Sequence, residues 1–571
     1  MTATPSPTVS GTHLKLRPPE QVMRLSRMGA FYPTRLSFMR KLIRRLSREQ
    51  AVVSRPVWEI DADGYGRAVY SVPLGGDVYS LVAFSTPLAP EHRSDRVIAE
   101  AWDTTYVLYD GVPTSRDLDR LAKNVPRQEA GRFARTELVL CRANKSVRLF
   151  EHVVERLSHG RQPDAETIRR IGYLLRTTAV YGNGKFGIAD RSRIEMRPAL
   201  RGAFQAEMLA VWLVRGFTHD LVEHIARERG GSHAVPLQAA VKRHIGVGNA
   251  TGLGMAPFLI SHPTLLHNWM LERETALAMV RAERRAAPET IDRFRTLLGR
   301  AGQHLGEWTT NDAIQASRIH DVRQELKDAA ALATSAWLAE PFPWNRLVTH
   351  AERWSLECQE LLVALILEPH GHLIDDIAQH WSNAQTPQIA PGTTLRQLNR
   401  HIAQQFAWAL AIDFEAPEAS HYFWYVSEDK QEPRLGDRRN EAGADQEMPL
   451  DVARQIQALA QALKTSDPDE TTATFLIRRP DLRYVVRRVQ TAVRHPYSEV
   501  QDNLISADCR PIDLLRCKLA QFGASKFDPK SDRWTRITLF QGAPTFDTIQ
   551  GSDADDWCFP ILDQGYETVT Q

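Results

Sequence analysis

Val78-Tyr-Ser-Leu-Val-Ala-Phe84 is made almost entirely of β-branched, aromatic and small apolar residues, a composition typical of a buried strand. Similar runs lie on both sides of it, at residues 57–60 (Val-Trp-Glu-Ile), 67–72 (Arg-Ala-Val-Tyr-Ser-Val) and 106–109 (Tyr-Val-Leu-Tyr). Asp61-Ala-Asp-Gly-Tyr-Gly66 and Leu74-Gly-Gly-Asp77 separate these runs with residues that favour hairpin turns. Residues 57–115 are therefore predicted to form a small antiparallel sheet, one face of which must pack on helices.

The rest of the chain has mainly helical spacing. Apolar residues recur three and four positions apart through most of residues 116–383, which predicts a helical core domain that includes a helix over 165–180. A Pro- and Gly-containing break predicts a linker at 384–397, followed by a C-terminal helical region, 398–546, with one short strand and a charged loop. Residues 1–20 are rich in Thr, Ser and Pro and are predicted to be disordered. The predicted fold is α+β and mainly helical, with the small N-terminal antiparallel sheet packed on a large helical body.

Charge is unevenly distributed along the chain. The net charge is +2, which argues against a dedicated nucleic-acid-binding protein. Residues 21–56 nevertheless hold nine Lys or Arg and one acid, whereas the acidic tail, 547–571, holds six acids and no Lys or Arg. These two segments are either solvated, which we favour, or complementary surfaces that dock on each other or on a partner.

The basic segment 21–56 contains one strongly amphipathic stretch. Leu36, Met39, Leu42, Ile43 and Leu46 share one face, and arginines and a lysine occupy the other. We expect an ordinary helix that packs its apolar stripe on the core while long Arg stems cover the outside. The alternative is a cationic surface helix that contacts nucleic acid, an acidic partner or, peripherally, a membrane.

Cysteine content and hydropathy indicate the compartment. Five cysteines without a C-x-x-C pair fit a reducing compartment and argue against a disulfide framework or a thiolate zinc site. No apolar run approaches the roughly 18 residues that a membrane helix needs. We therefore expect a soluble, cytoplasmic protein; its excess of Arg over Lys is typical of GC-rich bacterial genes, and a homo-oligomer is left open.

The first candidate binding segment is the glycine-rich stretch from Ile245 to Phe258. Its G-x-G-x-x-x-G pattern follows what reads as a helix end, so no Rossmann-type NAD(P) site is expected. A helix–turn–helix is predicted instead, whose backbone N–H groups could bind an anion. The residues assigned to the ligand are Gly248, Asn249, Thr251 and Gly252. Tight packing of another helix against these glycines is the alternative explanation.

The second candidate segment is Arg176-Thr-Thr-Ala-Val-Tyr-Gly-Asn-Gly-Lys-Phe-Gly187. It is not a nucleotide P-loop, because Ala179 and Phe186 replace the first glycine and the magnesium-binding hydroxyl of that motif. Lys185 is a candidate catalytic base or anion-binding cation, and Tyr181 and Asn183 are candidate ligand contacts. A helix C-cap with a surface lysine is the alternative.

The third candidate segment is the charged loop that begins at Ser427. Ser427 and Lys430 match S-x-x-K, although Pro433 disfavours the helix that this motif requires. Lys430 is assigned as a candidate catalytic residue and Arg434 as an anion contact. A solvated charged loop is the alternative.

Two histidine-rich segments complete the candidates. His370, His372, Asp376 and His380 could hold zinc or iron, or the histidines could merely form hydrogen bonds at a helix corner. In the second segment, His219 with Glu223 and Asp220 with His224 are four residues apart on one predicted helix, and exposed intrahelical ion pairs are expected.

These features favour an enzyme that acts on an anionic small molecule, a carboxylate or a phosphate. The glycine-rich segments and the Lys and Arg residues would bind it in a pocket lined by helices. One alternative is a binding or adaptor protein that uses the cationic helix, and another is a His-ligated metalloenzyme. No P-loop nucleotide site is expected.

Overall fold

The computed structural model describes, with their side chains, residues 15–89, 91, 101–127, 134–178, 194, 196–249, 263–377, 388–417, 452–501, 509–510, 512–524 and 535–562. It describes the backbone alone of the strand residues 8–9, 12–13, 250–252, 424–426, 433–435, 526–529 and 534. The chain forms two compact units, each assembled from separate stretches. Unit 1 comprises residues 1–32, 253–287 and 336–518, and unit 2 comprises residues 33–252, 288–335 and 519–571.

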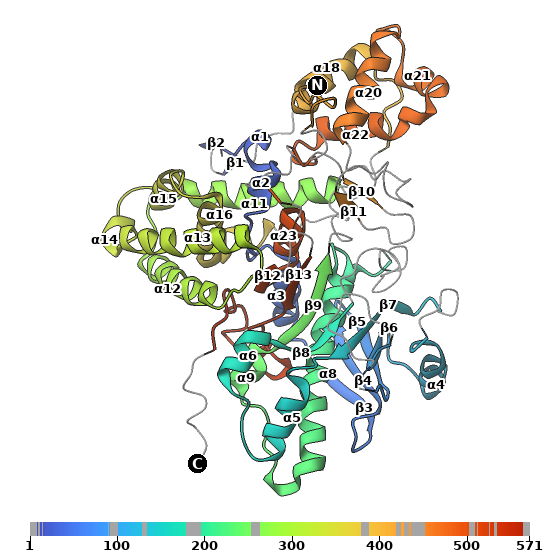
Figure 1. Ribbon diagram of the computed structural model, residues 1–571, viewed down its shortest axis with the longest axis vertical. Helices are drawn as coiled ribbons and strands as arrows, with labels where there is room; N and C mark the ends of the chain where they lie inside the picture. The colour runs from blue at the N-terminus through green and yellow to red at the C-terminus, as the bar shows by residue number, and fades with distance from the viewer. Residues whose placement is uncertain are drawn as a thin grey trace. The chain divides into compact units, whose positions relative to one another are not determined.

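Unit 2 is built on one nine-stranded sheet in the order β12-β13-β9-β8-β7-β6-β5-β4-β3 (Figure 1). All neighbouring strands are antiparallel except β8 and β9, which are parallel. In chain order the strands are β3 (Ser54–Ile60), β4 (Gly66–Leu74), β5 (Asp77–Ser85), β6 (Thr104–Asp110), β7 (Glu137–Lys145), β8 (Tyr173–Thr177), β9 (Gly246–Gly252), β12 (Lys526–Pro529) and β13 (Trp534–Leu539).

The predicted hairpin between β4 and β5 is confirmed. Leu74 pairs with Asp77, so the turn between them has two residues, Gly75 and Gly76. Both glycines have positive φ, 65° and 88°, as the turn types that suit the twist of a hairpin require.

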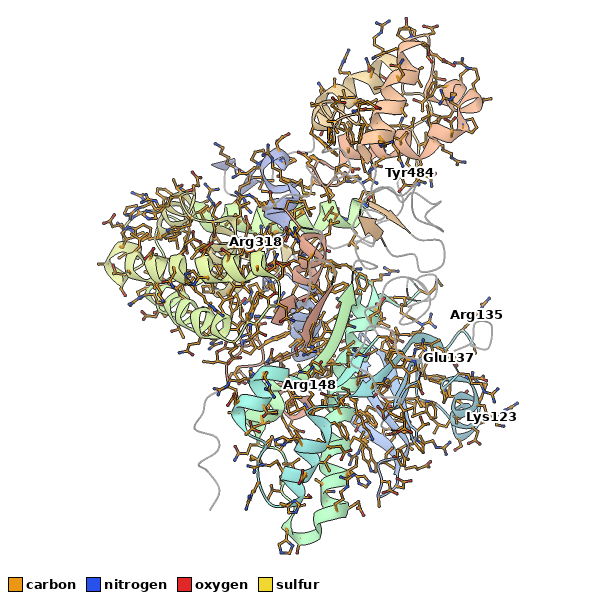
Figure 2. The ribbon with its side chains drawn as sticks, in the orientation of Figure 1. Lys123, Arg135, Glu137, Arg148, Arg318 and Tyr484 are labelled. Atoms are coloured by element: carbon orange, nitrogen blue, oxygen red, sulfur yellow. The ribbon has the colours of Figure 1, made fainter. Side chains whose placement is uncertain are left out.

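Helices cover both faces of the sheet around β4, β5 and β6. Val69, Val82 and Val107 pack on one face against α4 (Ser115–Asn124), whose Lys123 projects away from the sheet (Figure 2). Tyr70 and Tyr106, adjacent to two of these valines in sequence, face the other way and place their rings edge-on to Phe217 of α8 (Gln205–Gly230). This alternation follows from the two-residue period of a strand.

The long helix α8 forms the centre of unit 2. It contacts every strand from β4 to β9, and α3 (Phe38–Arg48) and α5 (Phe150–Ser158) pack on it. The remaining helices of unit 2 are α6 (Ala165–Ile171), α9 (Ala239–His244), α12 (Pro288–Gly306) and α13 (Ala313–Leu332), with short 3-10 turns at Pro198–Leu200, Gly231–His233 and Phe546–Thr548.

In the part of unit 1 that the structure describes, the elements are helices and two short hairpins, β1 (Thr8–Val9) with β2 (Thr12–His13) and β10 (Trp424–Val426) with β11 (Pro433–Leu435). One apolar cluster joins α18, α19, α20, α21 and α22. The helices of unit 1 are α1 (Pro19–Val22), α2 (Leu25–Met28), α11 (Pro263–Ala282), α15 (Pro343–Ala351), α16 (Leu356–Leu367), α17 (Gly371–Ile374), α18 (Leu395–Gln405), α19 (Ala407–Leu410), α20 (Val452–Lys464), α21 (Thr472–Arg478) and α22 (Arg483–Arg494), with 3-10 turns at Glu368–His370 and Pro480–Leu482. Two helices, α14 (Ser335–Leu338) and α23 (Ile512–Phe522), contain a unit boundary.

A buried ionic cluster ties the N-terminal segment into unit 1. The Arg17 guanidinium donates two hydrogen bonds of 2.7 Å to Glu274 of α11 and one of 2.8 Å to Glu360 of α16. Arg27 and Arg273 also bind Glu360, and the three arginines together hold its pKa well below its usual range although burial alone would raise it. The disorder predicted for residues 1–20 therefore does not extend to Arg17.

The predicted class, mainly helical α+β, is confirmed, and several local predictions within it are wrong. Residues 173–177 form strand β8 where a helix over 165–180 was predicted, because α6 ends at Gly172, whose φ is +77°. Residues 246–252 form strand β9 instead of a glycine-rich turn between two helices. The apolar run at the start of β8, Tyr173-Leu-Leu175, is short enough to fit a strand as well as a buried helix. In the C-terminal region, α18 begins at Leu395, inside the predicted linker.

The basic segment and the acidic tail dock on each other within unit 2, against the solvated arrangement that we favoured. Asp555 accepts hydrogen bonds from Arg35 at 2.6 Å and from Arg40 at 3.0 Å, and Asp556 binds Arg293 and Arg300 of α12. The apolar stripe of α3 is fully buried, as predicted. The cationic face of α3 is thus at least partly occupied by the chain's own C-terminal segment.

Candidate functional site

The two predicted glycine-rich segments overlap the ends of two neighbouring strands of the sheet, β8 and β9. β8 and β9 are adjacent and parallel, with Tyr173 opposite Gly246 and Arg176 opposite Gly248. The two strands therefore end toward the same edge of the sheet, and the chain continues from that edge after each. Ligands of open sheets with parallel strands bind beyond the carboxyl ends of those strands. The candidate residues Tyr181, Asn183 and Lys185, which come soon after β8, lie outside the described residues.

Asn249 is the best-defined candidate at this edge. Its side chain is 1% exposed, and its Nδ2 donates a 2.7 Å hydrogen bond to the carbonyl of Thr177, the last residue of β8. Its Oδ1 is buried and has no hydrogen-bond partner among the residues that the structure describes. Buried amide oxygens almost always have a donor, so this atom marks a position where a ligand group or an ordered water fits.

Close packing explains two of the glycines in β9. A Cβ at Gly246 would lie 2.4 Å from the carbonyl oxygen of Leu539, and one at Gly248 would lie 2.5 Å from the ring of Tyr173. These contacts support the packing alternative at both positions, although the packing partners are neighbouring strands instead of a helix. Thr251 and Gly252 pair through their backbones with Thr535 and Trp534 of β13.

The third predicted segment belongs to unit 1. Arg434 lies in β11 opposite Tyr425 of β10, and its backbone alone is described. Lys430, in the connection between these strands, lies outside the described residues.

The histidine corner at α17 is held by hydrogen bonds. His370 is fully buried; its Nδ1 lies 2.6 Å from the carbonyl of Ile366 and its Nε2 lies 3.2 Å from Glu283 Oε2. Burial raises the pKa of Glu283, but hydrogen bonds from His370 and Trp344 lower it by more. The ring centroids of His370 and His372 are 6.1 Å apart. No group of three His, Cys, Asp or Glu side chains suited to a metal ion occurs within the described ranges, and these exclude the fourth candidate ligand, His380.

Three of the four titratable residues at the middle of α8 bind other elements instead of one another. Asp220 accepts hydrogen bonds from Tyr70 Oη at 2.6 Å and from Arg55 Nη1 at 2.8 Å. His224 Nε2 lies 2.8 Å from the carbonyl of Asp61. The expectation of exposed intrahelical pairs is therefore wrong, because α8 is surrounded by the sheet and other helices and its polar side chains reach partners there.

The other two titratable residues at the middle of α8 are Glu223 and His219. Glu223 accepts from the backbone N–H of Leu237 at 2.8 Å and pairs with Lys242 Nζ of α9, also at 2.8 Å. His219 is 4% exposed, and its Nε2 is buried with no hydrogen-bond partner in the described structure.

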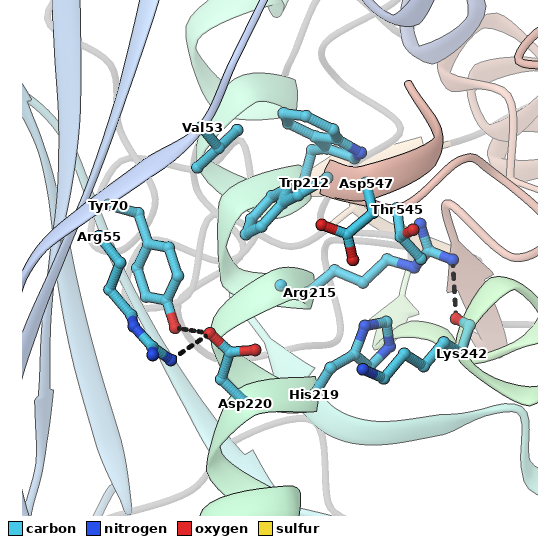
Figure 3. Close-up of a pocket in the computed structure, with 12 residues that line it drawn as sticks. Val53, Arg55, Tyr70, Trp212, Arg215, His219, Asp220, Lys242, Thr545 and Asp547 are labelled. Carbon is cyan, nitrogen blue, oxygen red and sulfur yellow. Dashed lines mark hydrogen bonds and ion pairs between the residues drawn. The ribbon is translucent and has the colours of Figure 1, made fainter. Parts of the chain in front are cut away.

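His219 lines a cavity of about 300 Å³ in unit 2, beside α8 (Figure 3). The other polar residues of its wall are Arg55, Tyr70, Arg215, Asp220, Lys242, Thr545 and Asp547, and its apolar wall includes Trp212 and Phe546. A partial signal for this cavity was present in the sequence, since His219 and Asp220 are adjacent titratable residues in the middle of a long helix. Tyr70 and Lys242 carried no signal, because they join the cavity from other parts of the chain, whereas Arg215 lies one helical turn before His219 on α8.

The surroundings of the cavity shift the pKa values of titratable groups that line it. Burial lowers the pKa of His219 well below its ordinary value, and the positive charges of Arg215 and Lys242 lower it further. Burial also lowers the pKa of Arg215, to about 9, with a contribution from Arg243. Burial, followed by the adjacent Asp220 carboxylate, raises the pKa of Tyr70. His219 is therefore a neutral imidazole and Tyr70 a neutral phenol at pH 7.

Comparisons of the chain with protein-family models, with curated proteins and with solved structures found no match. Across the described residues, every helix is too short or too polar to cross a membrane.

Proposed function

We propose that the protein is an enzyme that acts on an anionic small molecule, a carboxylate or a phosphate, bound beyond the ends of β8 and β9. The observation that carries this proposal is the parallel pairing of these two strands in an otherwise antiparallel sheet. Because of it, the ends of β8 and β9, which belong to two glycine-rich segments and are about 75 residues apart in the sequence, lie at one edge of the sheet.

The residues proposed to act there have distinct tasks. Asn249 would orient the substrate through its buried amide, whose oxygen lacks a donor among the described residues. Lys185 would neutralise the negative charge or take up a proton, whereas the cations Lys430 and Arg434 belong to unit 1 and are not assigned to this site. Tyr181, Asn183, Thr251 and the backbone of Gly252 would complete the contacts.

We also propose that the enzyme acts in the cytoplasm of a bacterium. All five cysteines are buried thiols that form no disulfide, as a reducing compartment favours.

A ligand screen tests the proposed function. Thermal unfolding of the wild-type protein is measured with a panel of small carboxylates and phosphates, and we expect at least one of them to raise the melting temperature in proportion to its occupancy. The dissociation constant of that ligand should rise about tenfold in Lys185→Gln, since a charge-assisted hydrogen bond is lost. Lys123→Gln, on the exposed face of α4, is the matched control and should bind as the wild type does. Equal affinity in the two variants would contradict the assignment of Lys185, and a panel without any ligand would contradict the proposed function.

A further inference from the structure

We propose that the cavity beside α8 is a separate binding site for a small organic anion, which places its carboxylate or phosphate group against Arg215, His219 and Lys242. This site does not rest on the proposed function. It lies where α9 leads into the start of β9, since Arg215 binds the carbonyls of Lys242, Arg243 and Ile245, whereas the proposed substrate site lies beyond the end of that strand.

Arg215 brings an uncompensated positive charge to the cavity. Its side chain is 1% exposed and donates to four carbonyl oxygens, those of Ile245, Pro544, Lys242 and Arg243, at 2.7–3.0 Å. These carbonyls hold the guanidinium in place, but no carboxylate within 4 Å neutralises it in the part of the chain that the structure describes. A buried charge without a counterion is costly, so an anion that enters the cavity gains an interaction that the protein itself does not provide.

His219 supplies a second, independent indication of a ligand. Its Nε2 is buried beside the cavity without a hydrogen-bond partner among the described residues, which is rare for a side chain that is 4% exposed. A bound anion favours the protonated form of the imidazole, which then donates from Nε2 to an oxygen of the anion. A bound anion would therefore satisfy both His219 and Arg215.

The other charged groups of the wall are paired with each other or with a neighbour, except for Asp547. Arg55 and Asp220 neutralise each other, and Lys242 faces the cavity while it pairs with Glu223. Asp547 is exposed and forms no ion pair with the described residues, so it is the one wall carboxylate that opposes an anion without a cationic partner of its own. Its removal should therefore strengthen anion binding.

The apolar wall indicates that the ligand is larger than an inorganic ion. Trp212 and Phe546 line the cavity, and the ring of Phe546 lies so close to Gly216 that a Cβ there would be 1.9 Å from it. A volume of about 300 Å³ exceeds what one phosphate ion occupies and is at the lower end for small-molecule sites. An organic group joined to the anion would fill the remaining space against these rings.

Three probes test this site in the full-length protein: inorganic phosphate, acetate and benzoate. We expect phosphate or benzoate to raise the melting temperature in a concentration-dependent manner, with benzoate exceeding acetate because its ring contacts Trp212 and Phe546. Stabilisation by benzoate alone would identify a carboxylate site, and stabilisation by phosphate alone a phosphate site. Failure of all three probes would overturn the proposal.

Two variants of opposite sign assign the binding to the cavity. Lys242→Gln should raise the dissociation constant of the active probe about tenfold, and Asp547→Asn should lower it two- to fivefold. Lys123→Gln is again the matched control, and Lys185→Gln should leave this binding unchanged, which separates the site from the proposed substrate site. Both Lys242 and Asp547 reach solvent, and unfolding without probe confirms that the variants fold. Unchanged affinity in both variants would overturn the proposal even if a probe binds.

Discussion

Gly216 illustrates how one residue connects packing with the cavity. It lies in the middle of α8, where glycine lacks the helix propensity of alanine, and the Phe546 ring occupies the space that a side chain would need. The sequence pattern predicts a ligand site at the glycines of residues 246–254, and packing against neighbouring strands explains two of these glycines instead. A glycine inside a long helix is an equally informative signal, because glycine lowers helix stability there and a closely packed neighbour explains its presence.

Gly216→Ala is predicted to destabilise the protein by about 1–3 kcal/mol, since the added methyl group must displace Phe546 from a packed wall. The free energy of unfolding in urea measures this effect. Gly299→Ala is the matched control, because Gly299 is an exposed helical glycine with open space where the Cβ would be, and there alanine should stabilise by about 0.5–1 kcal/mol. Destabilisation by both substitutions to the same extent would contradict the role assigned to Phe546.

At the scale of elements, sequence periodicity located most helices and the hairpins of the sheet, and it failed where partners are distant in the chain. The β4–β5 hairpin and the apolar stripe of α3 are local patterns, so they could be predicted. The strand β9 lies between β8 and β13, and β13 comes more than 280 residues later in the chain, so no local pattern reveals that it is a strand. The candidate site could not be predicted for the same reason. The ends of β8 and β9 are neighbours because of the sheet topology, which neither segment alone reveals.

The contact between α3 and the C-terminal segment leads to a prediction about pH. Burial raises the pKa of Asp555, but Arg40, Arg35 and Arg44 lower it by more, to about 2. Its contribution to stability is therefore complete above the pKa of an unfolded aspartate, about 3.9, and is lost as pH falls toward 2. Asp555→Asn should lower the free energy of unfolding by about 1–2 kcal/mol at pH 7, an amount reduced by partial solvent exposure, and by less at pH 3.

Urea unfolding at the two pH values checks this prediction. Asp119→Asn is the control, because Asp119 is 70% exposed in its ion pair with Arg67 and should contribute little at either pH. If Asp555→Asn lowers the free energy of unfolding as much at pH 3 as at pH 7, the ion pairs of Asp555 do not account for its contribution to stability.

At the scale of the whole molecule, each unit is assembled from stretches that are far apart in the chain. Unit 2 takes its first strands from residues 54–110 and its last from residues 526–539, with unit 1 contributed largely by the chain between them. β13 pairs with β9 along six residues, so the end of the chain is an integral part of the sheet. Composition and periodicity describe contiguous segments, and for that reason they could not reveal this discontinuous organisation.

Removal of the last stretch should therefore disrupt unit 2 although most of its sequence remains. A chain that ends at residue 518 lacks β12 and β13 and leaves the edge of β9 unpaired, which favours aggregation. We expect it to be insoluble or to lose the cooperative unfolding transition of unit 2, as circular dichroism and calorimetry would show. A chain that ends at residue 562 retains both strands and the Asp555 contacts and should fold. Native-like unfolding of the shorter chain would contradict the observed topology.

The central claim is tested most directly by a crystal structure of the protein with a bound anion. The anion is the one from the panel that Lys185→Gln binds more weakly than the wild type does. The account predicts ligand density beyond Thr177 and Gly252, with a polar ligand atom within hydrogen-bond distance of the Asn249 side chain. Density for that ligand only at another place, the α8 cavity included, would contradict the claim that the neighbouring ends of β8 and β9 form the substrate site.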